Sequence, residues 1–125
     1  MTDYLVDTDV LIDHLRGARL FALPDGSSGA YSIITRAELN AGRRAESQPI
    51  NALLSQLDEV ALTSRIAMRA GEIKRVTSVG LADAIVAATA LESGRIVMTR
   101  NRKHFERVEG LEIVADPMEE TREQE

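Results

Sequence analysis

Two patterns of apolar residues alternate along the chain: short apolar runs, and longer segments in which apolar side chains recur every three or four positions. The first pattern is typical of buried strands, and the second of helices that pack on a sheet. Their regular alternation predicts a parallel sheet with crossover helices. We therefore predict an α/β fold with a central, mostly parallel sheet.

Local signals place the elements of this sheet and its helices. Gly17 and Gly94 follow two helical segments, and Thr35 is a candidate N-cap because Glu38 stands three residues later. The predicted strands are 4–6, 30–34, 59–62, 96–98 and 111–114. The predicted helices are 8–15, one after Thr35, one starting at Ser47 with Pro49, one from Thr63 or Ser64 to 76, then 81–93 and 101–107.

Composition places the chain among globular proteins. It has 125 residues, of which 44% are hydrophobic and 28% charged, so we expect a single domain over 1–125 with a frayed acidic tail at 119–125. No cysteine is present, which excludes disulfides and thiolate metal sites. We find no targeting signal or membrane-spanning run and expect a cytoplasmic protein. The net charge of −5 by itself argues against a nucleic-acid partner.

Three acids follow predicted strands or open helices. Asp7 comes directly after the first strand, and Glu38 is expected in the first turn of the helix after the second. Asp83 is the only charged residue between positions 75 and 92, in the apolar segment LADAIVAATAL, so we expect it to be buried all round. An acid in such a place is costly unless it is paired or binds a metal.

Thr99 and Asn101 follow the fourth strand, so polar groups from four segments converge on one edge of the predicted sheet. Each has an ordinary structural interpretation as well. Asp7 is also a candidate helix cap, Glu38 a capping-box partner of Thr35, Asp83 a favourable charge at a helix start, and Thr99 with Asn101 a cap and turn. We interpret Asp9 and Asp13 as supporting or solvent-facing residues.

Four stretches resemble one family in order: VDTDVLID, SIITRAELNAG, LADAIVAATAL and IVMTRNRKHF. Over residues 4 to about 114 the chain resembles PIN-domain ribonuclease toxins of the VapC type, which implies a three-layer α/β/α sandwich. The resemblance implies that Asp7, Glu38 and Asp83 are the core metal-binding acids of a toxin–antitoxin endoribonuclease. It also implies a cognate antitoxin, an RNA substrate and a homodimer.

The chain departs from the family pattern after the fourth strand. There the family often has an aspartate, but this sequence has Asn101 and His104, with Lys103 between them. Asn can ligate a cation through its carbonyl oxygen but adds no negative charge. We expect a weaker or absent second metal site and retained activity.

The candidate donors are oxygens, which suit Mg²⁺ or Mn²⁺. Zinc is disfavoured because no cysteine is present and His14 and His104 lie far apart in the sequence. The cation would activate a water for attack on the phosphate, and Glu38 or Asp83 would orient that water or accept its proton.

Basic residues offset the acidic net charge locally. We expect Arg100, Arg102 and Lys103, next to the presumed site, to contact RNA phosphates. The basic residues at 43–44 and 65–75 either do the same or lie on solvated helix faces. Only four aromatic residues are present, so base stacking is expected to be a minor part of RNA recognition.

The antitoxin expected from the resemblance requires an apolar groove. The helix bearing Ile50, Leu53, Leu54 and Leu57, with the face around Leu39, is a candidate wall of that groove. The alternative is that these side chains simply pack on the sheet.

Other functions remain open at this stage. A PIN fold that binds RNA or an antitoxin without cutting has the same motifs. The Asp7-Thr8-Asp9 segment also opens haloacid-dehalogenase-like phosphatases, but no acid pair follows a late strand here. A receiver-type phosphoacceptor site needs a central aspartate ending a strand, whereas Asp58 precedes its strand.

Overall fold

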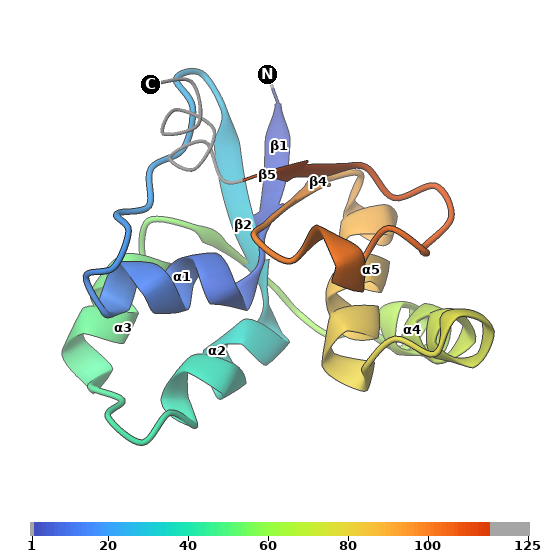
Figure 1. The fold of residues 1–125 in the computed structure, drawn as a ribbon, viewed down its shortest axis with the longest axis horizontal. Coiled ribbons are helices and arrows are strands. Elements are labelled where there is room, and N and C mark those ends of the chain that lie inside the picture. The colour runs from blue at the N-terminus through green and yellow to red at the C-terminus, as the bar shows by residue number, and fades with distance from the viewer. Residues whose placement is uncertain (1, 116–125) are drawn as a thin grey trace.

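A computed structural model describes residues 2–115, and the predicted tail at 119–125 lies outside that range. Its sheet has the strand order β3-β2-β1-β4-β5, and every neighbouring pair of strands is parallel (Figure 1). The predicted parallel sheet is therefore confirmed. The strands are β1 (Asp3–Val6), β2 (Ser28–Ser32), β3 (Asp58–Val60), β4 (Ile96–Thr99) and β5 (Ile113–Ala115).

Helices connect the strands as crossovers. The predicted helix over 8–15 and the predicted helix over 81–93 are found at those bounds. The helices are α1 (Thr8–Leu15), α2 (Ile33–Asn40), α3 (Ser47–Leu54), α4 (Ser64–Thr77) and α5 (Leu81–Ser93), with a 3-10 turn η1 (Arg102–His104). None of the helices in residues 2–115 is long and apolar enough to cross a membrane.

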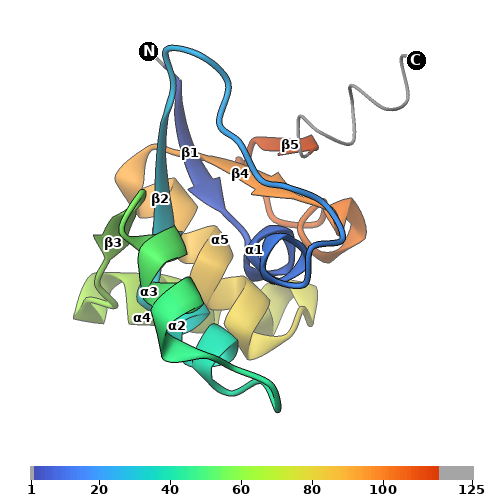
Figure 2. The ribbon, with the colours of Figure 1, turned by 90° about the vertical axis from the view of Figure 1, so that its left-hand side faces the viewer.

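Consecutive residues of β1 point to opposite faces of the sheet and so belong to two different cores. Val6 packs with Leu11 of α1 and with apolar residues of α2 and α3. Leu5 packs on the other face with Val86 and other residues of α5. The sheet thus lies between α1–α3 on one side and α4–α5 on the other, which confirms the three-layer sandwich (Figure 2).

Helix α5 is the most deeply buried helix among those described. Every residue from Ala84 to Ala90 is buried, and the small alanine side chains let the helix approach both α4 and the strands. Gly94 ends it with φ 67°, a left-handed conformation that favours glycine. The burial stops at the first turn, which carries Asp83.

The start of α2 differs from the prediction. Ser32, not Thr35, is the N-cap, and its hydroxyl accepts from the Ile34 N–H at 3.3 Å. Ile33 and Ile34 are β-branched and favour a strand in the sequence. Because Ser32 caps the helix, both residues instead form the first turn of α2. Glu38 consequently lies in the second turn of α2 rather than the first.

Three further boundaries are corrected. The third and fifth strands are 58–60 and 113–115 instead of 59–62 and 111–114, and the helix expected at 101–107 is only the short turn η1. Each error is a shift of one to three residues at a short edge element, where few side chains are buried to set the register.

We predict that Leu11→Ala lowers the free energy of unfolding by about 2–5 kcal/mol, because Leu11 is fully buried between α1 and the sheet. The matched control is Leu20→Ala, at a leucine that is 64% exposed, where we expect a change within about 0.5 kcal/mol. Urea unfolding followed by circular dichroism measures both. Equal losses in the two variants would contradict the packing described here.

Candidate active site

The site lies where the strand order reverses. The chain adds β2 and β3 on one side of β1 and then β4 and β5 on the other, so the reversal falls between β1 and β4. In open α/β sheets, ligands bind at this point, outside the carboxyl ends of the strands. Asp7 follows β1 there, beside Thr99 at the end of β4, and the Asp7 N–H donates to the Met98 carbonyl at 2.9 Å.

Asp7 is held by donors from two segments. It is only 6% exposed. The Thr99 hydroxyl donates to its Oδ2 at 2.8 Å, and the Thr8 N–H donates to its Oδ1 at 2.9 Å. Asp7 is therefore both the N-cap of α1 and a carboxylate fixed in the crevice, so the capping interpretation and the site interpretation both apply.

Glu38 reaches the same region through Thr8. The Thr8 hydroxyl donates to Glu38 Oε1 at 2.7 Å and lies 2.9 Å from the Thr35 hydroxyl. Because a hydroxyl has one proton, Thr8 accepts from Thr35 while it donates to Glu38. Both threonines are buried. Sequence reasoning missed this link, since it gave no role to Thr8 and interpreted Thr35 as a cap.

Asp83 stands in the first turn of α5, facing the segment after β4. Its side chain is 30% exposed, so the prediction that it is buried all round is wrong. The apolar surroundings begin only at Ala84, one residue further into the helix. His104 Nδ1 lies 3.3 Å from Asp83 Oδ2.

Of the two interpretations of Asp9, the solvent-facing one does not fit, because Asp9 is half-buried among the other acids. Asn101 donates its side-chain amide to Asp9 Oδ2. Asp9 Oδ1 is buried and has no hydrogen-bond partner among residues 2–115. Within a helix, residues two positions apart lie on different faces. Asp7 precedes the helix in an extended conformation, at φ −71° and ψ 151°, so this rule does not apply to Asp7 and Asp9.

Burial and crowding change the acidity of these groups. Burial, together with the negative charge of Asp9 and a hydrogen bond between the two carboxyls, raises the pKa of Asp7 to about 8, against the lowering effect of the bonds from Thr99 and Thr8. Burial also raises the pKa of Asp83, where the charge of His104 opposes the shift and that of Asp9 adds to it. The crevice therefore holds more negative charge than its own donors neutralise.

This crowding fits a hard divalent cation. The donor set consists of carboxylate, hydroxyl and amide oxygens, and Asp9 Oδ1 is a buried acceptor without a donor. Within residues 2–115, no three acidic or histidine side chains are already grouped closely enough to hold a metal. Mg²⁺ commonly takes only one or two protein carboxylates and keeps several waters, so a closed triad is not required.

Comparison with known proteins decides the family. Residues 4–111 match the family model for the PIN domain. The chain belongs to the PIN domain family. It is 38% identical to ribonuclease VapC10 of Mycobacterium tuberculosis, over 86% of this chain and 89% of that protein. It is 34% identical to ribonuclease VapC1 of Methanocaldococcus jannaschii, over 87% and 85%.

Solved structures agree on the fold of this PIN domain. A toxin–antitoxin complex from Klebsiella pneumoniae superimposes with a TM-score of 0.71 at 30% identity, covering 91% of this chain and 96% of that one. VapBC2 from Rickettsia felis, bound to a DNA fragment from its promoter, has a TM-score of 0.75 at 18% identity, covering 91% and 98%.

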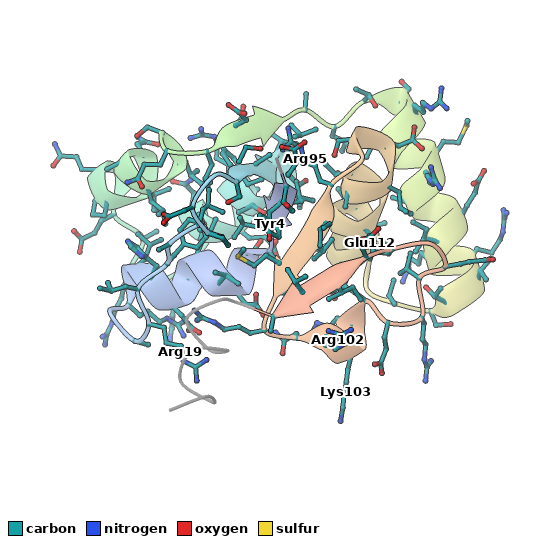
Figure 3. All side chains as sticks on the ribbon, turned by 90° about the horizontal axis from the view of Figure 1, so that it is seen from above. Tyr4, Arg19, Arg95, Arg102, Lys103 and Glu112 are labelled. Carbon is teal, nitrogen blue, oxygen red and sulfur yellow. The ribbon has the colours of Figure 1, made fainter. Side chains whose placement is uncertain are left out.

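The basic residues of this PIN domain take different positions around the site. Arg100 has an 8% exposed side chain and pairs with Asp13 of α1. Arg102 and Lys103 are exposed on η1, and Figure 3 shows Lys103 extending away from the fold. Arg95 precedes β4, at the opposite end of that strand from Thr99, and Figure 3 shows it apart from Arg102 and Lys103.

The predicted site residues thus occupy one end of the sheet. Asp7 and Thr99 are in direct contact, Glu38 is joined to them by Thr8, and Asn101 is joined through Asp9. Asp83, on α5, lies close enough to Asp9 for the charge of Asp9 to help raise the pKa of Asp83. Their individual roles in binding a metal or in chemistry stay predictions.

The raised pKa of Asp7 predicts a pH dependence of stability in the metal-free protein. Between its ordinary pKa of 3.8 and about 8, folded Asp7 keeps a proton that the unfolded chain has lost. The free energy of unfolding therefore falls as pH rises through this interval, by up to about 1.4 kcal/mol per pH unit. Asp7→Asn removes this contribution, so its stability should fall less between pH 5 and pH 8.

Urea unfolding of both proteins in EDTA, at several pH values in that range, measures the difference. Parallel pH profiles for the wild type and Asp7→Asn would show that Asp7 is ionised in the folded protein at neutral pH.

Proposed function

We propose that this PIN domain is the toxin of a type II toxin–antitoxin system and acts as a Mg²⁺-dependent endoribonuclease. The observation that carries the proposal is the group of carboxylates at the β1–β4 switch point, with Asp7 clamped by Thr99 and one oxygen of Asp9 left without a donor. The names of the relatives, ribonucleases VapC10 and VapC1, support the same activity for this chain.

The acids are proposed to have two roles: some hold the cation, and one accepts the proton of the attacking water. Asp7 and Asp83 are proposed to hold Mg²⁺, or Mn²⁺ in its place, with Glu38 as the third core acid. When bound, the cation would polarise the scissile phosphate and lower the pKa of a water. Glu38 has one oxygen engaged by Thr8, so its other oxygen is available to orient that water or accept its proton.

Thr99 and Asn101 position the carboxylates. The Thr99 hydroxyl donates to Asp7 and accepts from the Asn101 N–H at 3.0 Å, so the turn after β4 is fixed relative to Asp7. Asn101 in turn donates to Asp9. A site held within a fraction of an ångström by such contacts gains rate because little reorganisation is needed during the reaction.

RNA would lie across η1 and the acidic crevice. Arg102 and Lys103 are exposed there and are proposed to bind phosphates, with Arg100 orienting the segment through its pair with Asp13. The local positive charge would offset the net charge of −5.

A groove beside the site suits the proposed antitoxin. It has a volume of about 740 Å³ and lies between α1, α2 and α3. Leu39 and Ile50 line the groove but are themselves buried, in the same core cluster as Leu53, Leu54 and Leu57, which do not line it. The groove also includes Glu38, so an occupant would cover one of the site acids. The toxin–antitoxin complexes among the similar structures support this partner.

A homodimer, a single domain over 1–125 and a cytoplasmic location also belong to this proposal. The exposed apolar side chains of α4, with Met68 at 68% and Val76 at 80%, are compatible with a second copy covering that helix. A PIN domain that binds RNA or antitoxin without cutting is the alternative, and turnover separates the two. The phosphatase interpretation is wrong, because the family match places the chain among PIN domains.

We predict that Asp7→Asn and Asp83→Asn each reduce RNA cleavage by roughly a hundredfold or more, because each removes a fixed charge from the reacting centre. The measurement is cleavage of total cellular RNA by the purified, antitoxin-free chain in Mg²⁺, Mn²⁺ or EDTA. Discrete fragments that require the metal are expected from the wild type.

The matched control is Asp58→Asn, an exposed aspartate at the start of β3, which should cleave at the wild-type rate. Folded Asp7→Asn and Asp83→Asn variants with unchanged rates would remove these residues from the mechanism. Intact RNA in every condition, with Mn²⁺ binding preserved, would point to the non-catalytic module or to a substrate absent from the RNA pool.

For the groove, we predict that Ala45→Trp weakens binding of the co-expressed antitoxin by roughly tenfold or more, because Ala45 is exposed and lines the groove. Ala61→Trp is the matched control, at an exposed alanine outside the groove lining. Titration calorimetry on the separated proteins gives both affinities. Equal affinities for the two variants would place the antitoxin elsewhere on the surface.

A further inference from the structure

Asp9 is the acid of the site that the structure leaves with an unmet acceptor. Its Oδ2 accepts from the Asn101 side-chain amide, whereas its Oδ1 is buried and has no donor among residues 2–115. A buried acceptor without a partner costs roughly 1–3 kcal/mol, and more when it is charged. The Asp7 carboxyl can hydrogen-bond to Asp9 while it keeps its proton. Once Asp7 is ionised, as a metal ligand would be, the Asp9 oxygen needs a cation or a water.

The position of Asp9 at the start of α1 does not account for this oxygen. A carboxylate in the first turn gains from the helix macrodipole, but that gain is available equally to a solvated side chain. Asp9 instead lies beside Asp7, and its charge acts on Asp83. Two neighbouring carboxylates repel each other unless one of them takes up a proton or a positive charge lies near both.

Asn101 fixes the position of Asp9 but adds no negative charge to the cluster. Its backbone N–H donates to Thr99, and its side-chain amide donates to Asp9, so it is tied to both sides of the crevice. The Asn101 amide is neutral and would not balance the charge of a cation. The carboxylate that it contacts would supply that negative charge. Asp9 is that carboxylate.

We propose that Asp9 is a direct ligand of the divalent cation, and that Asn101 is a positioning residue that holds it. The inference deepens the proposed function and rests on it. Asp9 then joins Asp7 and Asp83 as a carboxylate ligand of the Mg²⁺ or Mn²⁺ ion, while Glu38 keeps its proposed role toward the water.

The contact between Asp9 and Asn101 allows a swap that separates charge from position. Asp9→Asn removes the carboxylate and should weaken Mn²⁺ binding by roughly tenfold or more, because affinity follows ligand charge. Asp9→Asn combined with Asn101→Asp returns one carboxylate and one amide to the same contact, and should recover wild-type affinity to within about threefold.

The experiment is calorimetric titration of the full-length, metal-free chain with Mn²⁺ alone, with circular dichroism to show that each variant is folded. Asp58→Asn is the matched control and should bind as the wild type does. Wild-type affinity in Asp9→Asn would overturn the inference while leaving the proposed ribonuclease intact. A folded swap variant that does not regain affinity would show that charge at this contact is not what matters, and would overturn it too. A wild type that binds no Mn²⁺ would instead refute the metal-dependent function itself.

Discussion

The site depends on one arrangement: a carboxylate buried between two parallel strands that are far apart in the sequence. Asp7 follows β1, and the Thr99 hydroxyl at the end of β4 donates to it, while its own N–H continues the ladder to Met98. The same carboxylate caps α1. One residue thus joins the sheet, the first helix and the crevice, so displacing it would disturb all three.

Two of the remaining acids, Glu38 and Asp9, are attached to this arrangement by neutral donors rather than by cations. Thr8, the first residue of α1, donates to Glu38, and Asn101, in the turn after β4, donates to Asp9. Hydrogen bonds of this kind orient carboxylates, but they do not remove the repulsion between them. The fold therefore pre-arranges the ligands and leaves their charge to be balanced by protons or by a bound cation, which explains why burial raises the pKa of Asp7 to about 8.

Sequence reasoning succeeded where a local pattern and the tertiary structure agree. The helices over 8–15 and 81–93 have clear ends, and Asp7 follows an unmistakable apolar run. It failed where a contact across the sheet decides the outcome. Nothing near Asp9 in the sequence announces Asn101 as its partner, 92 positions away, and nothing marks Ser32 rather than Thr35 as the cap. The exposure of Asp83 was missed because helix composition describes an average, whereas burial changes within one residue at a helix start.

The distribution of charge explains how an acidic chain can present a site to a polyanion. Arg100 is paired internally with Asp13, whereas Arg102 and Lys103 stand exposed on the turn that follows Thr99. That turn is tied to the acids through Asn101, so the exposed cations lie on the same short segment of backbone as the residue that contacts Asp9. Phosphate attraction and metal ligation are therefore coupled by geometry: the segment that would hold the RNA backbone also holds Asp9. A partner that covered this turn or the neighbouring groove would act on both at once.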